Sequence, residues 1–222
     1  AVLVAMASWV MMLIGRVRFS ELMKLVGWGV AGIVVVMTLN LGRSETAEGR
    51  VSTWIHLWTN SQTEKPIEHL SDTERSMIAI HNGGIFGEGA GQSAMRVEMI
   101  HPESDYAYAF FVEEYGLLLA VVLLMLYLWI FFRAIEIFRR CGTAFPGLLV
   151  LGLALLITCQ ALLHVMVTVN LIPETGQTLP LISRGGSSTL FTTIALGMIL
   201  SVSRQNDEQS HDTPRSESIY ER

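Results

Sequence analysis

The stretch Pro173-Glu-Thr-Gly-Gln-Thr-Leu-Pro-Leu-Ile-Ser-Arg-Gly-Gly-Ser-Ser188 is the most informative part of this chain. It is a polar loop rich in proline and glycine, and it lies between two apolar runs that are each long enough to cross a bilayer. Irregular backbone at a membrane is tolerated only where protein or a water-filled cavity satisfies its amides and carbonyls. We therefore expect the loop to be part of a site rather than a passive connection.

The composition is that of a membrane protein. The chain has 222 residues, of which 51% are hydrophobic and 16% are charged, and its mean hydropathy is +0.45. Soluble domains average about 25% charged residues. The net charge of -5 does not favour nucleic-acid binding, and Cys141 and Cys159 show neither metal-ligand spacing nor a disulfide framework. Because the chain opens inside an apolar run without an initiator Met, we interpret it as the C-terminal part of a longer protein.

Five apolar runs predict an all-α polytopic membrane protein with about five transmembrane helices. Most of the runs approach the roughly 17–25 residues that a spanning helix needs. They cover about residues 1–14, 25–41, 116–132, 146–172 and 186–203. We expect one membrane-embedded domain over residues 1–204. Residues 205–222 are polar and lack apolar periodicity, which predicts a disordered tail.

Basic residues in the short loops predict the orientation of the chain in the membrane. The loops 15–24 and 133–145 carry Lys and Arg and fall on one face if the spans alternate. This face, which also holds the C-terminal tail, should be cytoplasmic. The outer loop 42–115, in which acidic residues outnumber basic ones, and the loop 173–185 then face the periplasm or cell surface of a bacterium.

The outer loop changes character along its length. Ser71-Asp-Thr-Glu74 has the pattern of a capping box and predicts a short helix. The run Asn82–Gly91 has too many glycines for a regular helix, and the absence of a preceding strand and of a following Lys-Ser/Thr argues against a phosphate-binding loop. We expect these glycines to let a segment pack closely against the helices. A helix should then run through Tyr106–Phe132 into the membrane.

Three carboxylates near that helix are candidates for chemistry. Asp105 lies near its N-terminus, where the helix dipole would keep a carboxylate ionised and competent as a base. An N-cap role for Asp105 is the alternative reading. Glu113 and Glu114 stand next to an uncharged run, so each is expected either to face a cavity or ion partner or to lie in the membrane interface.

Two further features lie within or beside the apolar runs. His164 should face the interior of the helical bundle, where a structural hydrogen bond is favoured over catalysis. The turn Gly185-Gly186-Ser187-Ser188 exposes backbone amides at the start of the last helix, a geometry that can bind anions, and Arg184 beside it adds positive charge.

Four motifs in this order resemble the SEDS family, whose branches include FtsW, RodA and SpoVE. They are Arg50-Val-Ser-Thr-Trp54, Ser76-Met-Ile-Ala-Ile-His-Asn-Gly-Gly-Ile-Phe-Gly-Glu-Gly-Ala-Gly-Gln-Ser93, Pro102-Glu-Ser-Asp-Tyr-Ala-Tyr-Ala-Phe-Phe-Val-Glu-Glu-Tyr-Gly116 and Gly176-Gln-Thr-Leu-Pro-Leu-Ile-Ser-Arg-Gly-Gly-Ser-Ser188. The resemblance covers nearly everything from about residue 25 to 204. Family members have ten spanning helices, so this chain resembles the last five. Its Leu-Pro-Leu-Ile-Ser sequence is more similar to the FtsW branch than to RodA.

The resemblance implies a peptidoglycan glycosyltransferase of cell division. Such an enzyme polymerises lipid II at the outer face of the cytoplasmic membrane and releases undecaprenyl pyrophosphate. Asp105 matches the family's essential aspartate, which would act as the general base. Residues implied to bind the pyrophosphate are Arg43, Arg50, Arg184, Gly185, Gly186, Ser187 and Ser188, and Glu98, Glu113 and Glu114 would line the cavity. The implied partners are a class B penicillin-binding protein transpeptidase and other divisome proteins. A divalent cation such as Mg²⁺ is a candidate for sharing the charge, its ligands are unknown, and no organic cofactor is implied.

This sequence departs from the family pattern at several positions. Arg184 stands where the family has Tyr, Arg75 where it has Gln, and Ile55-His-Leu-Trp58 where it has Asn-Pro-Trp. Two other functions stay open: a lipid II flippase and a non-catalytic scaffold of the division machinery. We expect residues 1–222 by themselves to be inactive, because five helices of the family fold are missing from them.

Overall fold

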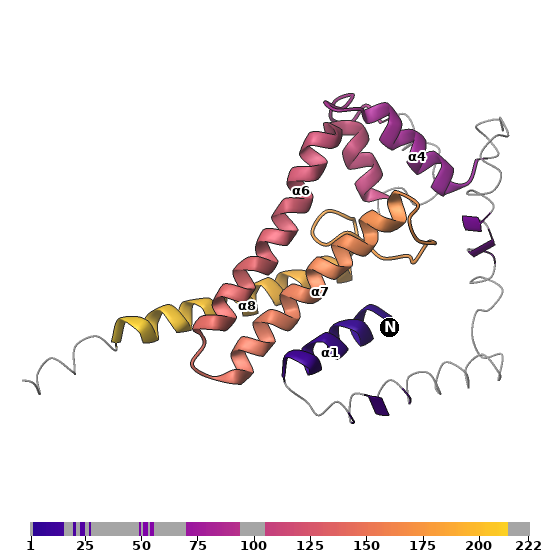
Figure 1. Ribbon diagram of the computed structural model, residues 1–222. Helices are drawn as coiled ribbons and strands as arrows, with labels where there is room; N and C mark the ends of the chain where they lie inside the picture. Colours follow the sequence, from indigo (N-terminus) through magenta and orange to yellow (C-terminus); the bar gives the residue numbers. More distant parts are fainter. Residues whose placement is uncertain are drawn as a thin grey trace, which may run out of the picture.

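The computed structural model describes residues 2–15, 20, 23–24, 27, 49, 51–52, 54–55, 70–93 and 105–212. Five bounded helices, labelled as in Figure 1, and no strand are found among these residues. The helices are α1 (Val2–Ile14), α4 (Asp72–Gly83), α6 (Ala107–Arg140), α7 (Ala144–Thr168) and α8 (Gly186–Asp212). The prediction of an all-α protein is confirmed for this part of the chain.

Three of the helices, α6, α7 and α8, are long and apolar enough to cross a membrane, and α1 is a shorter apolar helix. The predicted apolar run 116–132 is helical from residue 117 onward, the run 186–203 is helical throughout, and α7 covers most of the run 146–172. The run 25–41 lies outside the described residues, so the number of five spans stays a prediction. Large apolar side chains such as Trp129 and Phe191 point outward, as is expected of helices that face lipid.

Helices α6 and α7 lie side by side and run in opposite directions, and α8 packs against both (Figure 1). Their shared core includes the small residues Ala120, Ala161 and Ala195 and the rings of Tyr108 and Tyr127. Small residues let membrane helices approach closely, which matters because lipid supplies no hydrophobic drive for helices to associate. α1 packs against α7.

The expectation of one continuous helix through Tyr106–Phe132 is wrong, because the chain reverses direction at Gly116. This residue has φ +83° and ψ 166° inside α6. A short limb (residues 107–115) and a long limb (residues 117–140) meet there as an inverted V beneath the loop that follows α4 (Figure 1). Only glycine adopts this φ without strain, so the residue type at position 116 permits the reversal.

The loop after α4 satisfies the backbone groups that the reversal would otherwise leave unpaired. Four hydrogen bonds join the two segments: Glu88 N to Glu113 O at 2.9 Å, Gly89 N to Glu114 O at 3.1 Å, Leu117 N to Gly84 O at 3.0 Å, and Leu118 N to Ile85 O at 3.4 Å. We call this contact between residues 83–89 and 112–118 the backbone joint. Each unpaired backbone group in hydrocarbon would cost several kcal/mol, so the joint makes the break in α6 tolerable.

Glycines make the backbone joint possible, as the sequence predicted for the glycine run. A Cβ atom on Gly83 would lie 2.2 Å from the carbonyl oxygen of Val112, and one on Gly87 would lie 2.4 Å from that of Glu114. A Cβ atom on Gly116 would lie 2.3 Å from the carbonyl oxygen of Ile85. These approaches are far inside van der Waals contact, so the two backbones touch without intervening side chains.

α4 begins with the predicted capping box. The backbone amide of Ser71 donates to a carboxylate oxygen of Glu74 at 2.8 Å, and the amide of Glu74 donates to the Ser71 hydroxyl at 3.3 Å. The buried face of this helix consists of small residues, Thr73, Ser76, Ala79 and Gly83. Small side chains on that face allow α4 to lie close to the short limb of α6.

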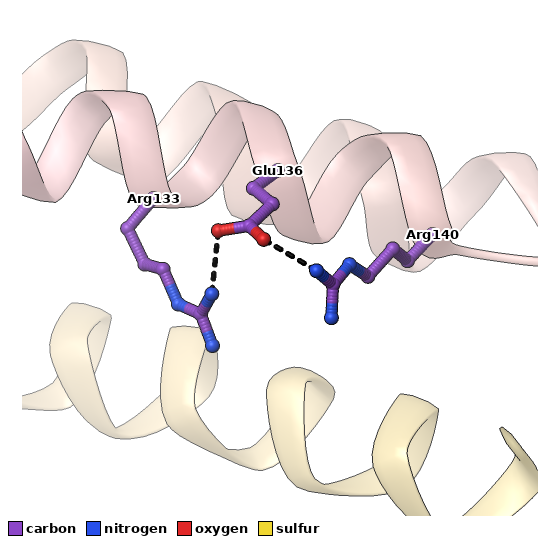
Figure 2. A network of polar contacts seen from close by, with 3 residues as sticks. All are labelled: Arg133, Glu136 and Arg140. Atoms are coloured by element: carbon purple, nitrogen blue, oxygen red, sulfur yellow. Dashed lines mark hydrogen bonds and ion pairs between the residues drawn. The ribbon is translucent and has the colours of Figure 1, made fainter.

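The C-terminal end of α6 is basic. Figure 2 shows Glu136 between two arginines, with one carboxylate oxygen 2.5 Å from Arg133 Nη1 and the other 2.5 Å from Arg140 Nη2. All three side chains are about half exposed, so these pairs contribute little to stability. With Arg139, the last two turns of α6 nevertheless keep a net positive charge.

The predicted disordered tail from residue 205 is wrong for residues 205–212, which continue α8 to Asp212. Two contacts extend the helix: Arg204 Nε lies 2.9 Å from Glu208 Oε1 one turn later, and Asn206 Nδ2 lies 2.9 Å from the Cys141 sulfur at the end of α6. The second contact gives these polar residues a tertiary anchor that hydropathy does not reveal. Residues 213–222 lie outside the described part of the chain.

Candidate active site

Asp105 lies just before the N-terminal end of the short limb of α6. The N-cap of α6 is Tyr106, which makes no side-chain capping bond, so the structure does not support an N-cap role for Asp105. The Asp105 carboxylate is half-buried and lies within electrostatic reach of His164. Among the described residues no donor hydrogen-bonds to it. A half-buried carboxylate within hydrogen-bond reach of a bound molecule can accept a proton from it.

His164 is buried in α7 and uses both ring nitrogens. Its Nδ1 lies 2.7 Å from the carbonyl oxygen of Gln177, and its Nε2 lies 3.4 Å from the backbone nitrogen of Tyr108. A carbonyl only accepts and an amide N–H only donates, so the ring carries its proton on Nδ1 and is neutral. The predicted structural hydrogen bonding is confirmed. His164 joins Gln177 of the loop 173–188 to Tyr108 of the short limb, and Tyr108 lies three residues after Asp105.

A cluster of three oxygens joins α4, the start of α6 and the loop 173–188. Glu174 Oε1 accepts hydrogen bonds from the Tyr106 hydroxyl at 2.5 Å and from the Thr73 hydroxyl at 2.6 Å. Burial raises the pKa of Tyr106 far above its ordinary value, and the Glu174 carboxylate adds to the rise, so the phenol remains a donor. We call Thr73, Tyr106 and Glu174 the hydroxyl–carboxylate cluster. Sequence reasoning missed it.

Glu113 faces the protein interior rather than the membrane interface. Its side chain has 0% exposure, and one carboxylate oxygen accepts a hydrogen bond from the Ser93 hydroxyl. The other, Oε1, is buried and has no hydrogen-bond partner among the described residues. Glu114 is half-buried, and its backbone carbonyl belongs to the backbone joint. The interfacial alternative therefore does not hold for Glu113, and its expected place in a cavity stays a prediction.

The loop 173–188 is held by protein, as expected for irregular backbone beside a membrane. Leu179 N donates to the Ser183 hydroxyl at 2.8 Å, and Ser183 N donates back to the carbonyl oxygen of Leu179 at 3.0 Å. The Tyr127 hydroxyl of α6 donates to the carbonyl oxygen of Pro180 at 2.5 Å. Leu181, between them, is exposed and has φ +68°, a conformation that is strained for a leucine.

The predicted anion-binding turn offers fewer backbone amides to a ligand than expected. The amide of Gly185 donates to the carbonyl oxygen of Ser183 at 2.8 Å, so it is not available to a ligand. α8 begins at Gly186, which leaves the amides of Gly186, Ser187 and Ser188 as the first of the helix, without intrahelical acceptors. Arg184 is exposed beside this turn.

Three predicted site residues, Arg43, Arg50 and Glu98, lie outside the described part of the chain. A neighbour of Arg50 is described: Trp54 Nε1 donates to the carbonyl oxygen of Asn170 at 3.1 Å. Within residues 70–93, 105–212 and the other described positions, no group of three or more His, Cys, Asp or Glu residues is arranged to hold a metal ion. The expectation of a divalent cation remains untested.

All four sequence motifs meet at the C-terminal turn of α7 and the two residues that follow it (residues 164–170). Each motif contributes one contact: Trp54 to Asn170 O, Ser76 Oγ to Thr168 O at 3.3 Å, Tyr108 N to His164 Nε2, and Gln177 O to His164 Nδ1. Motifs that are far apart in sequence thus surround one end of one helix, with Asp105 beside it. This convergence makes the region the candidate active site.

Comparison with known proteins identifies similar chains. The family model described as cell cycle protein (FtsW, RodA, SpoVE) matches residues 1–208. A probable peptidoglycan glycosyltransferase FtsW of Caulobacter vibrioides is 36% identical over 131 residues, 59% of this chain and 34% of the relative. Stage V sporulation protein E of Bacillus subtilis is 31% identical over 156 residues, 70% of this chain and 41% of the relative.

Two longer matches extend the similarity over most of the chain. A probable peptidoglycan glycosyltransferase FtsW of Coxiella burnetii is 27% identical and covers 93% of this chain and 54% of its own length. A solved structure concerning "structural coordination of polymerization and crosslinking by a peptidoglycan synthase complex" has the same fold, with TM-score 0.62 and 22% identity over 93% of this chain and 55% of that one. The chain thus spans about a third to a half of the length of the curated relatives it matches.

Proposed function

The chain belongs to the FtsW, RodA and SpoVE family of cell cycle proteins, and we propose that its protein is a peptidoglycan glycosyltransferase of cell division. The reaction is the polymerisation of lipid II into glycan strands, with release of undecaprenyl pyrophosphate. Relatives named probable peptidoglycan glycosyltransferase support the reaction class. The observation that carries the proposal is the half-buried carboxylate of Asp105 at the end of α7, where all four motifs meet.

Asp105 is the general base of the proposed reaction. Its carboxylate takes the proton of the 4-hydroxyl of an incoming lipid II sugar as that oxygen bonds to the anomeric carbon of the growing chain. The bond between the anomeric carbon and the phosphate oxygen breaks at the same centre, and the electron pair leaves with undecaprenyl pyrophosphate. His164 is a poor rival for this role, because both of its nitrogens are already hydrogen-bonded. A positioned base typically contributes about 10²- to 10⁴-fold to the rate.

Positive charge and backbone amides stabilise the leaving pyrophosphate in this proposal. Arg184 and the amides of Gly186–Ser188 are the described groups suited to it, since a helix N-terminus and a cation both favour an anion. Arg43 and Arg50 complete the proposed set. A divalent cation such as Mg²⁺ would add Lewis-acid charge at the pyrophosphate. No organic cofactor is proposed.

The protein is proposed to lie in the bacterial cytoplasmic membrane with Asp105 on its outer face. The basic end of α6 in Figure 2 supports this orientation, because Lys and Arg accumulate on the cytoplasmic side. The contact between Asn206 and Cys141 brings the end of α8 to the same side, which supports a cytoplasmic C-terminus. The end that carries α4 is the opposite one (Figure 1), and Asp105 directly precedes Tyr106, whose hydroxyl contacts Thr73 of α4.

The proposed partners are a class B penicillin-binding protein transpeptidase and other proteins of the division machinery. The shared fold with a chain of a solved peptidoglycan synthase complex supports a partner of this kind. A transpeptidase would cross-link the strands that the glycosyltransferase makes, so the two activities belong on the same face of the membrane.

The test is lipid II polymerisation by the natural full-length protein, purified with and without its transpeptidase partner. We expect Asp105→Asn to lose at least about 100-fold in rate, in line with the loss of a positioned base. Asp207→Asn, the same substitution at an exposed acid on α8, is the matched control and should keep the rate of the unaltered protein.

Three results would decide against the proposal. Normal polymerisation by Asp105→Asn would remove Asp105 from the chemistry. Transport of lipid II across vesicle membranes without polymerisation would favour a flippase. Normal cell division with Asp105→Asn in place of the natural protein would favour a non-catalytic scaffold.

A further inference from the structure

A carboxylate outside the proposed reaction is bound to the segment that carries Asp105. Glu174 Oε1 accepts from the hydroxyls of Tyr106 and Thr73, and the two hydroxyl oxygens lie 3.1 Å apart. Each hydroxyl has a single proton to donate, so when both donate to Glu174 their mutual approach follows from sharing one acceptor. Hydrogen bonds to a carboxylate are about twice as strong as those between neutral groups.

The two hydroxyl groups are fixed in the protein and do not hang on loose side chains. Thr73 and Tyr106 are each only 4% exposed. The ring of Tyr106 packs in a core cluster with Ala79, Ala109 and Phe110. Close-packed interiors transmit displacement rather than absorb it. The position of Glu174 is therefore coupled to that of the Tyr106 backbone.

Asp105 is the residue next to Tyr106, so its Cα lies about 3.8 Å away across one peptide bond. A second tie follows two residues later, where Tyr108 N donates to His164 and His164 donates to the carbonyl oxygen of Gln177. Both ties lead from the residues after Asp105 to residues 174–177. The same loop continues to Arg184 and the first amides of α8.

We propose that Glu174 is a positioning residue, which through the hydroxyl–carboxylate cluster holds Asp105 at a fixed place relative to the loop 173–188. The inference rests on the proposed function, in which Asp105 activates the nucleophile while that loop holds the leaving group. Such a reaction needs both groups at a set distance across the anomeric carbon, and a misplacement of about 1 Å can cost about 100-fold in rate.

The first measurement is steady-state polymerisation by the natural full-length protein and its Glu174 variants. Glu174→Ala should lower kcat roughly 10- to 100-fold and change KM for lipid II by less than about 2-fold, because the substrate is bound but the base is misplaced. Glu174→Gln keeps an oxygen acceptor at the same place and should recover most of kcat. Thr175→Ala, at the exposed neighbouring position, is the matched control and should keep the rate of the unaltered protein.

The second measurement reads the placement of residue 105 without using the reaction. Asp105→Cys is treated with a small maleimide, and the modified peptide is identified by mass spectrometry so that Cys141 and Cys159 are counted separately. Adding Glu174→Ala should change the modification rate at position 105 severalfold, because the tie to the loop is lost. Tyr106→Phe removes one hydroxyl of the same cluster and keeps the ring, so it repeats the test if Glu174→Ala does not fold.

The outcomes separate the inference from the proposed function. Unchanged kcat in Glu174→Ala, or an unchanged modification rate at position 105, would overturn the positioning role and leave the glycosyltransferase proposal intact. A rise in KM with constant kcat would also overturn it, since that pattern indicates lost substrate binding. If the full-length protein does not polymerise lipid II, the proposed function fails, while the modification rate still decides whether Glu174 places residue 105.

Discussion

The backbone amide of Leu117 donates a hydrogen bond to the carbonyl oxygen of Gly84, 3.0 Å away, directly after the point where α6 reverses direction. A helix that starts inside a membrane protein leaves its first amides without intrahelical acceptors. Here the loop after α4 supplies the acceptors. The break in α6 and the glycine run are thus one structural unit, and the short limb that carries Asp105 depends on it.

Substitution of Gly116 should destabilise the protein strongly. In Gly116→Ala the added methyl would meet the carbonyl oxygen of Ile85 at 2.3 Å and would also have to adopt φ +83°. We expect a loss of about 3 kcal/mol or more, seen as a lower apparent Tm of the purified full-length protein in detergent. Gly197→Ala, in a helical position with nothing within 4 Å of the added carbon, is the control and should lose no stability. Equal effects of the two variants would contradict the role of the backbone joint.

Ser93 should stabilise the protein through its hydrogen bond to the Glu113 carboxylate. In Ser93→Ala the buried side chain of Glu113 loses its hydroxyl donor, and a hydrogen bond to such a group contributes about 1.5–3 kcal/mol. We expect a measurable drop in apparent Tm and no comparable drop for Ser201→Ala, which changes an exposed serine on α8. The decrease should largely vanish when Glu113 is also replaced by Leu, which has no oxygen to accept the hydrogen bond. An undiminished effect in the double variant would show that Ser93 acts elsewhere.

Tyr106 gives the stability a dependence on alkaline pH. Burial and the Glu174 carboxylate raise the pKa of Tyr106 in the folded protein above its ordinary value of about 10. The unfolded chain therefore loses the phenol proton first, and the stability from this group is present below pH about 10 and falls as the pH rises further. The apparent Tm of the unaltered protein should drop more steeply from pH 10 to 11 than that of Tyr106→Phe. Parallel curves would contradict the buried phenol.

The proposed orientation can be checked with single cysteines at the two ends of the bundle. Ala90→Cys lies in the exposed loop after α4, and Arg139→Cys lies at the basic end of α6. In intact cells with a permeable outer envelope, an impermeant maleimide should modify the first and not the second. Both should react after the cytoplasmic membrane is opened. The reverse pattern would invert the topology and remove Asp105 from the outer face.

Much of the fold could be predicted because the determining interactions are local. The apolar runs that became α7 and most of α8 follow from length and hydropathy alone, and the capping box of α4 lies within four residues. The interior place of His164 could also be expected, because a lone imidazole in an apolar run needs partners. The partners themselves, Gln177 O and Tyr108 N, could not be named from spacing.

The parts that could not be predicted depend on contacts between distant residues. Gly116 stands in an apolar pattern that continues on its far side, and a single glycine in such a pattern is an ordinary small cost to a helix. Only the approach of residues 84–89 turns it into a reversal. In the same way Glu174 meets Tyr106 across 68 positions and Thr73 across 101, and no local pattern reports such a meeting.

The backbone joint restricts which substitutions the protein can accept at positions 83–89 and 112–118. Ile85 and Phe86 stand at its tip with their side chains 61% and 85% exposed, and the contact uses their backbone rather than their side chains. Substitution of these two side chains is therefore compatible with the contact, whereas a single methyl group at position 83, 87 or 116 would force the two segments apart. The backbone joint thus requires glycine at three positions and places no such requirement on the exposed side chains at its tip.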